Sequence, residues 1–231
     1  MEDLPFPEGT PLVAFHLKNG GSCWKHTLVY PDEEMVTPAY FSDCSQFRKF
    51  PDIVVHRGSD EAGEVVGGAV FRFSRNCKLL RGPGSTEKVN FDEDSLVRDE
   101  LVELLSERRG TYSMTVPSSR GDQDIRWEKT KKKEHGVRGT GKWWCCSKMM
   151  YNYLITDSAD GDVLGVYLQH PSLTMFKRGR LLLKDDLEES TKDYLLLAAI
   201  SLAEKARRNA QAAQGAGVAG GQAGWMAGSV Y

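Results

Sequence analysis

Positive charge is concentrated in residues 129–142, where Glu134 is the only acid and the glycines are typical of a loop. Ammonium and guanidinium groups attract lipid phosphates, at about 1 kcal/mol per Lys or Arg near a membrane surface. RNA phosphates would be attracted on the same grounds. A second basic cluster follows at residues 177–180. The candidate headgroup-binding residues are Lys129, Lys131, Lys132, Lys133, Arg138, Lys142, Lys177, Arg178 and Arg180. The alternative interpretation is a solvated hairpin loop that binds nothing.

Cysteine and histidine offer a second chemistry. Cys23 and His26 lie three residues apart and His16 precedes them, but one Cys and two His at irregular spacing fall short of a zinc pattern. A Cys–His nucleophile also needs a third, orienting group, and none is evident. The vicinal pair Cys145–Cys146 is no CxxC motif. We therefore expect reduced thiols, no metal, no cofactor and no catalysis.

The acidic segment at residues 157–162 superficially resembles a calcium loop. Ala159 and Gly161 occupy positions that need oxygen ligands in an EF-hand, so we interpret the segment as a hairpin turn. The sequence also contains no Walker loop, dinucleotide fingerprint or GxSxG motif.

Composition limits the function classes further. The formal net charge is −2, which argues against a dedicated nucleic-acid binder, and we expect no nucleic-acid partner. No stretch reaches the roughly 18 apolar residues of a membrane span. The acidic, proline-broken start is unlike a secretion signal, and the five cysteines lack framework spacing. A cytoplasmic protein is expected, with a peripheral membrane location if the basic loop binds lipid.

The elements that must position these residues are mostly strands. Short β-branched and aromatic runs alternate with Gly, Pro and Asp turns, which predicts an antiparallel sheet or barrel. Asp160-Gly161 predicts a hairpin between residues 151–156 and 163–169. The expected strands are 11–18, 27–30, 52–57, 64–73, 77–81, 111–116, 125–130, 142–156, 163–169 and 180–184.

Two segments predict helices. Residues 94–109 carry an apolar stripe at helical spacing, so we expect a helix outside the sheet. Residues 186–209 contain a stretch at 194–203 that is apolar on every side, which predicts burial all round. Ten helical residues span about 15 Å, too short for a bilayer, so this helix should thread a barrel. The uncharged Gly/Ala/Gln-rich residues 211–231 predict a disordered tail after a domain of residues 1–210.

A family resemblance rests on the order of these parts. They are the Trp127 strand at 125–130, the hairpin at 153–167, Gly179-Arg180-Leu181, the helix at 193–208 and the run at 52–58. The chain resembles the tubby C-terminal-like superfamily, which includes tubby proteins, phospholipid scramblases and LURP-one-related proteins, and it is most similar to an uncharacterised fungal branch. The resemblance implies a mainly β (α+β) fold, a closed antiparallel barrel of about twelve strands around a buried hydrophobic C-terminal helix.

The resemblance also sets the functional expectation. Tubby proteins bind phosphoinositide through basic residues on the barrel, although no local motif maps that site onto this chain. Scramblases carry a cysteine-rich palmitoylation run and an acidic calcium segment that are missing here, so lipid scrambling is not expected. We expect a non-enzymatic intracellular module that docks on anionic phospholipid, including phosphoinositide, through the basic loop. The alternatives are an adaptor that uses residues 211–231 or 94–109 without lipid binding, and an enzyme built on the cysteines and histidines.

Overall fold

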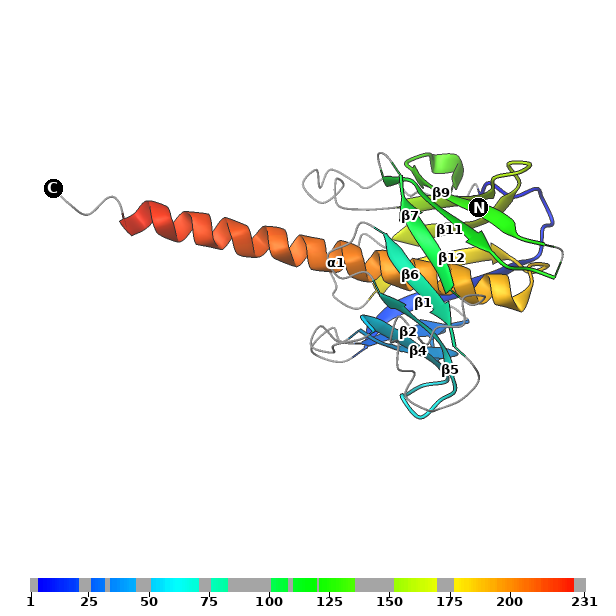
Figure 1. Ribbon diagram of the computed structural model, residues 1–231, viewed down its shortest axis with the longest axis horizontal. Helices are drawn as coiled ribbons and strands as arrows, with labels where there is room; N and C mark the ends of the chain where they lie inside the picture. Colours follow the sequence, from blue (N-terminus) through cyan, green and yellow to red (C-terminus); the bar gives the residue numbers. More distant parts are fainter. Residues whose placement is uncertain are drawn as a thin grey trace.

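The computed structural model is a closed barrel in which all neighbouring strands are antiparallel (Figure 1). The strands are β1 (Leu12–Gly20), β2 (His26–Tyr30), β3 (Tyr40–Asp43), β4 (Ile53–Arg57), β5 (Val65–Val70), β6 (Cys77–Arg81), β7 (Leu101–Ser106), β8 (Tyr112–Val116), β9 (Gln123–Thr130), β10 (Asn152–Asp157), β11 (Val163–Gln169) and β12 (Lys177–Lys184). A 3-10 turn, η3 (Lys133–His135), lies between β9 and β10, and helix α1 (Glu189–Met226) follows β12. The structure describes residues 4–20, 26–31, 34–44, 51–70, 76–82, 101–107, 110–119, 121–135, 152–169 and 177–226, of which 133, 177, 178 and 210–226 by backbone alone.

The first and last strands close the barrel. β1 pairs with β12, with Phe15 opposite Leu181, and with β2, with Leu17 opposite Val29. The mainly β fold and the closed antiparallel barrel predicted from the sequence are therefore confirmed. The expected hairpin is also confirmed, because β10 pairs with β11 and Gly161 adopts a φ of 77°, the left-handed region that a tight turn uses.

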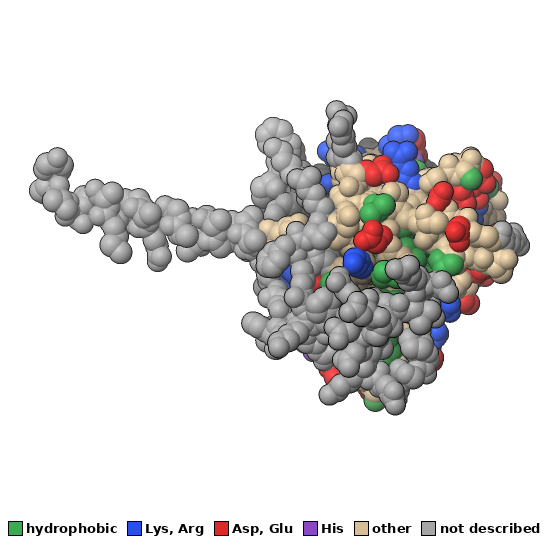
Figure 2. All heavy atoms as spheres, viewed as in Figure 1, with side chains coloured by type: hydrophobic (Ala, Val, Ile, Leu, Met, Phe, Trp, Pro, Cys, Tyr) green, Lys and Arg blue, Asp and Glu red, His purple; other side chains and the backbone are tan. Residues whose placement is uncertain are grey.

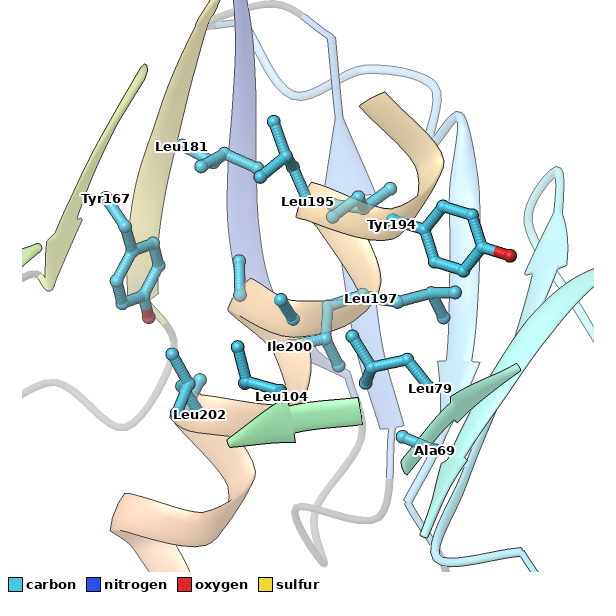
Figure 3. Packing of buried hydrophobic residues seen from close by; sticks show 14 of the residues in the cluster. Ala69, Leu79, Leu104, Tyr167, Leu181, Tyr194, Leu195, Leu197, Ile200 and Leu202 are labelled. Carbon is cyan, nitrogen blue, oxygen red and sulfur yellow. The ribbon is translucent and has the colours of Figure 1, made fainter. Parts of the chain in front are cut away.

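Helix α1 packs between opposite walls of the barrel. Residues Tyr194 to Ile200 are all at most 1% exposed, so no face of this stretch meets water. Figure 3 shows its side chains directed toward Leu181 on one side and Leu79 on the other. Close approach to β5 depends on Gly67, where a Cβ would lie 2.8 Å from Leu197 Cδ1 and 2.4 Å from a strand carbonyl. Each fully buried leucine or isoleucine contributes about 1.5–3 kcal/mol.

The topology defines two ends of the barrel. α1 begins shortly after β12 ends at Lys184, and we call this the proximal end. At the opposite, distal end β9 stops at Thr130 and β10 begins at Asn152, its register partner. β11 stops and β12 begins there too, with Gln169 opposite Gly179. α1 leaves the barrel at the distal end and continues well beyond it (Figure 1).

The prediction of an outer helix over residues 94–109 is wrong where it can be checked, because Leu101–Ser106 forms strand β7. Val102 and Leu104 are buried and lie opposite Leu79 and Cys77 of β6, whereas Glu103 and Leu105 are exposed. This run of apolar residues fits a helical stripe and a strand alternation equally well, and pairing with β6 selects the strand. Residues 94–100 lie outside the described part of the chain.

The end of the chain continues helix α1, whose backbone extends over residues 211–226 to Met226. The disordered tail expected over residues 211–231 stays a prediction. These residues extend a helix that is already nucleated inside the barrel, so no new nucleus is needed, although the five glycines at 215, 217, 220, 221 and 224 are poor helix formers. Residues 227–231 lie outside the described part. A domain boundary near residue 210 stays a prediction.

Candidate anion-binding site

The structure brings the two basic clusters to the same end of the barrel. Lys129 is the penultimate residue of β9, and the backbone of η3 begins at Lys133. Lys177, Arg178 and Arg180 are among the first four residues of strand β12. β10 and β11 lie between these strands, so β9 and β12 are about 14 Å apart at the usual strand spacing. Arg138 and Lys142 lie outside the described residues.

Lys129 lies at the distal end of β9, two residues after the fully buried Trp127. Its own side chain is exposed, and the adjacent Thr130 is buried. Gly110, in the turn between β7 and β8, has a φ of 77°, and a Cβ added to it would lie 2.7 Å from Lys129 Nζ. Burial lowers the pKa of Lys129, and the neighbouring Lys131 ammonium lowers it further. A bound phosphate would offset this repulsion, because opposite charge nearby favours the protonated amine.

The segment after β9 has a defined local geometry. Thr130 Oγ1 and His135 Nδ1 share a hydrogen bond of 2.6 Å, and the Lys132 N–H donates to the same hydroxyl oxygen at 3.2 Å. Lys132 Nζ lies 3.1 Å from Glu134 Oε1, although both side chains are exposed. Burial and Lys132 lower the pKa of His135, while Glu134 opposes them. The backbone from Thr130 to His135 is thus closed into a compact turn, with Lys131 and Lys132 exposed on it.

Helix α1 contributes charged residues to this end that the sequence analysis did not select. Lys205 Nζ lies 5.8 Å from the centre of the Tyr112 ring. Arg207 and Arg208 donate to the carboxylate of Glu204, which is fully buried, through Nε atoms at 2.7 Å and 3.0 Å. The i, i+3 and i, i+4 spacing of the carboxylate and two guanidiniums was the available sequence signal.

The proximal end has the opposite character. Arg57, Arg81, Lys184 and Lys192 are its described basic partners, and they pair with only part of the acids. The acids in its described loops and helix start are Asp60, Glu61, Glu64, Asp122, Asp124, Asp157, Asp160, Asp162, Asp185, Asp186, Glu188 and Glu189. Figure 2 shows acidic side chains, with several Lys and Arg side chains among them, on the described part of the visible face. The small net charge therefore conceals an uneven distribution of the described charges along the barrel axis, although Asp43, Asp52, Glu107, Glu134 and Glu204 lie at the distal end.

The proximal end contains a small cleft, which is the second candidate for a binding site. It has a volume of about 220 Å³ and is lined by Arg81, Pro117, Ser118, Ser119, Glu188, Ser190 and Tyr194. Its polar groups already have partners within the protein. The Ser119 N–H donates to Glu188 at 3.0 Å, and Arg81 Nε lies 3.4 Å from a carboxylate oxygen of Asp193. It is also smaller than the roughly 300–1,000 Å³ of typical ligand sites. We therefore place the candidate site at the distal end.

The cysteine and histidine candidates are only partly described. Cys23, Cys145 and Cys146 lie outside the described residues. His26 Nδ1 is 3.7 Å from Asp43 Oδ1, and its ring centre is 5.0 Å from that of Phe41. Within the described part of the chain, no three His, Cys, Asp or Glu side chains are grouped so that they could hold a metal ion.

A comparison of the chain with protein-family models, curated proteins and solved structures found no match. Among the described residues, no helix is both long and apolar enough to cross a bilayer.

Proposed function

We propose that this protein is a non-enzymatic binding module that docks reversibly on anionic phospholipid membranes through its distal end. One observation carries the proposal: the strand registers gather the basic ends of β9 and β12 at one end, while more than half of the described acids lie at the other. An anionic surface attracts one end of such a molecule and repels the other, which orients it during approach. The tubby-like resemblance supports phosphoinositide as the preferred headgroup.

The geometry of the basic residues supports the same reading. Lys129 and Lys131 lie close enough for the charge of Lys131 to lower the pKa of Lys129, an arrangement that a multivalent phosphate would stabilise. Lys131 and Lys132 are exposed beside them. The ion pair of Lys132 with Glu134 is solvent-exposed, and such pairs contribute only about 0–1 kcal/mol. A headgroup could displace that pair at small cost.

An adaptor without lipid binding is the second candidate. It is favoured by the part of α1 beyond the barrel, a helical segment that a partner protein could contact. This candidate predicts a partner that is lost when residues 211–231 are deleted, with no affinity for vesicles. The outer-helix version of this idea loses residues 101–106, which form strand β7.

Vesicle sedimentation tests the proposal. We expect binding to vesicles that contain phosphatidylserine or a phosphoinositide, weakening as salt rises, and none to neutral phosphatidylcholine. Changing Lys131→Gln with Lys132→Gln should cost about 2 kcal/mol, or roughly thirtyfold in affinity. The paired changes Lys131→Arg and Lys132→Arg should retain binding.

A matched control separates a local site from net charge. Ser59→Glu with Ala62→Glu, both on the exposed proximal turn between β4 and β5, lowers the net charge by the same amount as the two glutamines. This variant should bind almost as well as the parent chain. The absence of vesicle binding by the parent, or an equal loss in both double variants, would refute docking through the distal end.

A further inference from the structure

The stretch of α1 outside the barrel has no role in the proposed function so far. Residues 209–226 contain no charged side chain, and the helical backbone continues to Met226. At 1.5 Å per residue this stretch is about 27 Å long. It emerges at the distal end, the same end at which β9 stops and β12 begins (Figure 1).

This length conflicts with docking by charge alone. Electrostatic attraction between exposed groups is largely screened beyond about 8–10 Å at physiological salt. A helix that stood between the barrel and the membrane would hold Lys131 about 27 Å from the headgroups, well outside that range. The basic end reaches an anionic surface only if residues 209–226 enter the lipid layer or bend aside.

We infer that residues 209–226 of α1 enter the interface of an anionic membrane and form its second contact, next to the basic end. This inference rests on the proposed function. Glutamines and an asparagine in the stretch require water or headgroup partners, so the helix belongs in the interfacial layer and not across the apolar interior. Trp225 and Met226 end the helix, and tryptophan is enriched at membrane interfaces.

Truncation after Arg208 should change the affinity for vesicles in opposite directions, depending on whether the helix enters the interface or stands between the barrel and the membrane. If the helix enters the interface, the truncated chain should bind anionic vesicles roughly tenfold more weakly than the full chain, since the lost apolar contacts no longer contribute. If the helix is a spacer, truncation should strengthen binding. The truncated chain keeps Glu204, Arg207 and Arg208 and with them the buried cluster, so its thermal melting should match that of the full chain.

A full-length variant tests the same contact without removing it. Ala216→Glu with Gly220→Glu places two carboxylates in the stretch and should weaken vesicle binding at least as much as truncation. The control Ser59→Glu with Ala62→Glu, which has the same net charge, should not. Subtracting the emission spectrum of Trp225→Phe from that of the full chain gives the fluorescence of Trp225. When vesicles are added, this emission should shift to shorter wavelength, and brominated lipid should quench it.

The outcomes separate the two proposals. If neither the full nor the truncated chain binds vesicles, docking itself is refuted and the inference falls with it. If both bind equally, docking stands and the inference alone is refuted. Equal binding together with a lower oligomeric mass after truncation would assign the helix to contacts between copies of the chain, and it would also overturn the inference.

Discussion

Arg208 near the distal end of α1 is hydrogen-bonded to Asp52, the residue that precedes β4, with Nη1 donating to Oδ1 at 2.8 Å. Arg208 also donates to Glu204, so the two carboxylates and the guanidinium form one cluster with Arg207. The cluster joins positions 156 residues apart in the chain. It ties the distal part of α1 inside the barrel to the residue that precedes β4.

The first prediction concerns this cluster. Asp52→Ala leaves a half-buried guanidinium short of one acceptor, and we expect a loss of about 1.5–3 kcal/mol in the free energy of unfolding. Urea denaturation followed by circular dichroism measures this loss. Glu64→Ala removes a carboxylate from the exposed pair with Arg57, at 4.0 Å, and should cost less than about 1 kcal/mol. Equal losses in the two variants would argue against a specific role for the cluster.

The second prediction concerns the helix inside the barrel. Ile200 is fully buried, so Ile200→Ala should leave a cavity and lower stability by about 2–5 kcal/mol. Leu196→Asp or Ile200→Asp, which buries a charge, should give insoluble protein. Val36→Ala provides the control, since Val36 is 74% exposed. Near-normal melting of Ile200→Asp would contradict a buried central helix.

The third prediction is a pH dependence due to Asp193. Burial raises the pKa of this carboxyl above its ordinary value of 3.8, although Arg81 and Arg57 oppose the shift and Glu189 adds to it. The folded state therefore binds the proton more tightly than the unfolded state. The resulting stability is complete below about pH 4 and is lost as pH rises through the higher folded pKa.

Asp193→Asn should remove that fall in stability between about pH 4 and the folded pKa, measured by urea denaturation at a series of pH values. The exposed Asp186 supplies the control, and Asp186→Asn should keep the profile of the parent chain. A profile for Asp193→Asn that follows the parent would show that another group is responsible.

The fourth prediction concerns thiol reactivity. Burial raises the pKa of Cys77 to about 11, with Asp52 adding to the shift and Lys205 opposing it. Since the thiolate is the reactive form, native Cys77 should resist alkylation that goes to completion in urea. Mass spectrometry of labelled peptides measures both rates, and Cys44, which is also buried, should behave alike. Native labelling of Cys77 at the rate of an exposed thiol would revive the cysteine-enzyme hypothesis.

The fold was largely predictable because its strongest signal is local. An apolar stretch without a polar face is explained only by enclosure, and residues 194–203 are indeed buried on every side. Strand β3 gave no such signal, because Tyr40, Phe41, Ser42 and Asp43 are all buried and polar and apolar types do not alternate. Strand β7 gave an ambiguous signal, since its two pairs of apolar residues fit both the helical spacing and the alternation of a strand.

The candidate site was less predictable, because it depends on registers between distant strands. Lys129 and Arg180 could be selected as cations from the sequence, but only the pairing through β10 and β11 places them at one end. Lys205 was not selected from the sequence, and its position over Tyr112 follows from how α1 packs in the barrel. The pairing of Arg208 with Asp52 needs the complete tertiary structure.

The order of elements along the chain has a consequence for folding during synthesis. β1 is made before the other strands, yet its partner β12 is the last strand, and the helix that fills the barrel begins only at Glu189. The inward apolar faces of all twelve strands therefore stay uncovered until the helix has been made. Such long-range pairing slows folding and exposes surfaces that chaperones recognise. Closure and filling of the barrel become a single late step, governed by the release of α1 from the ribosome.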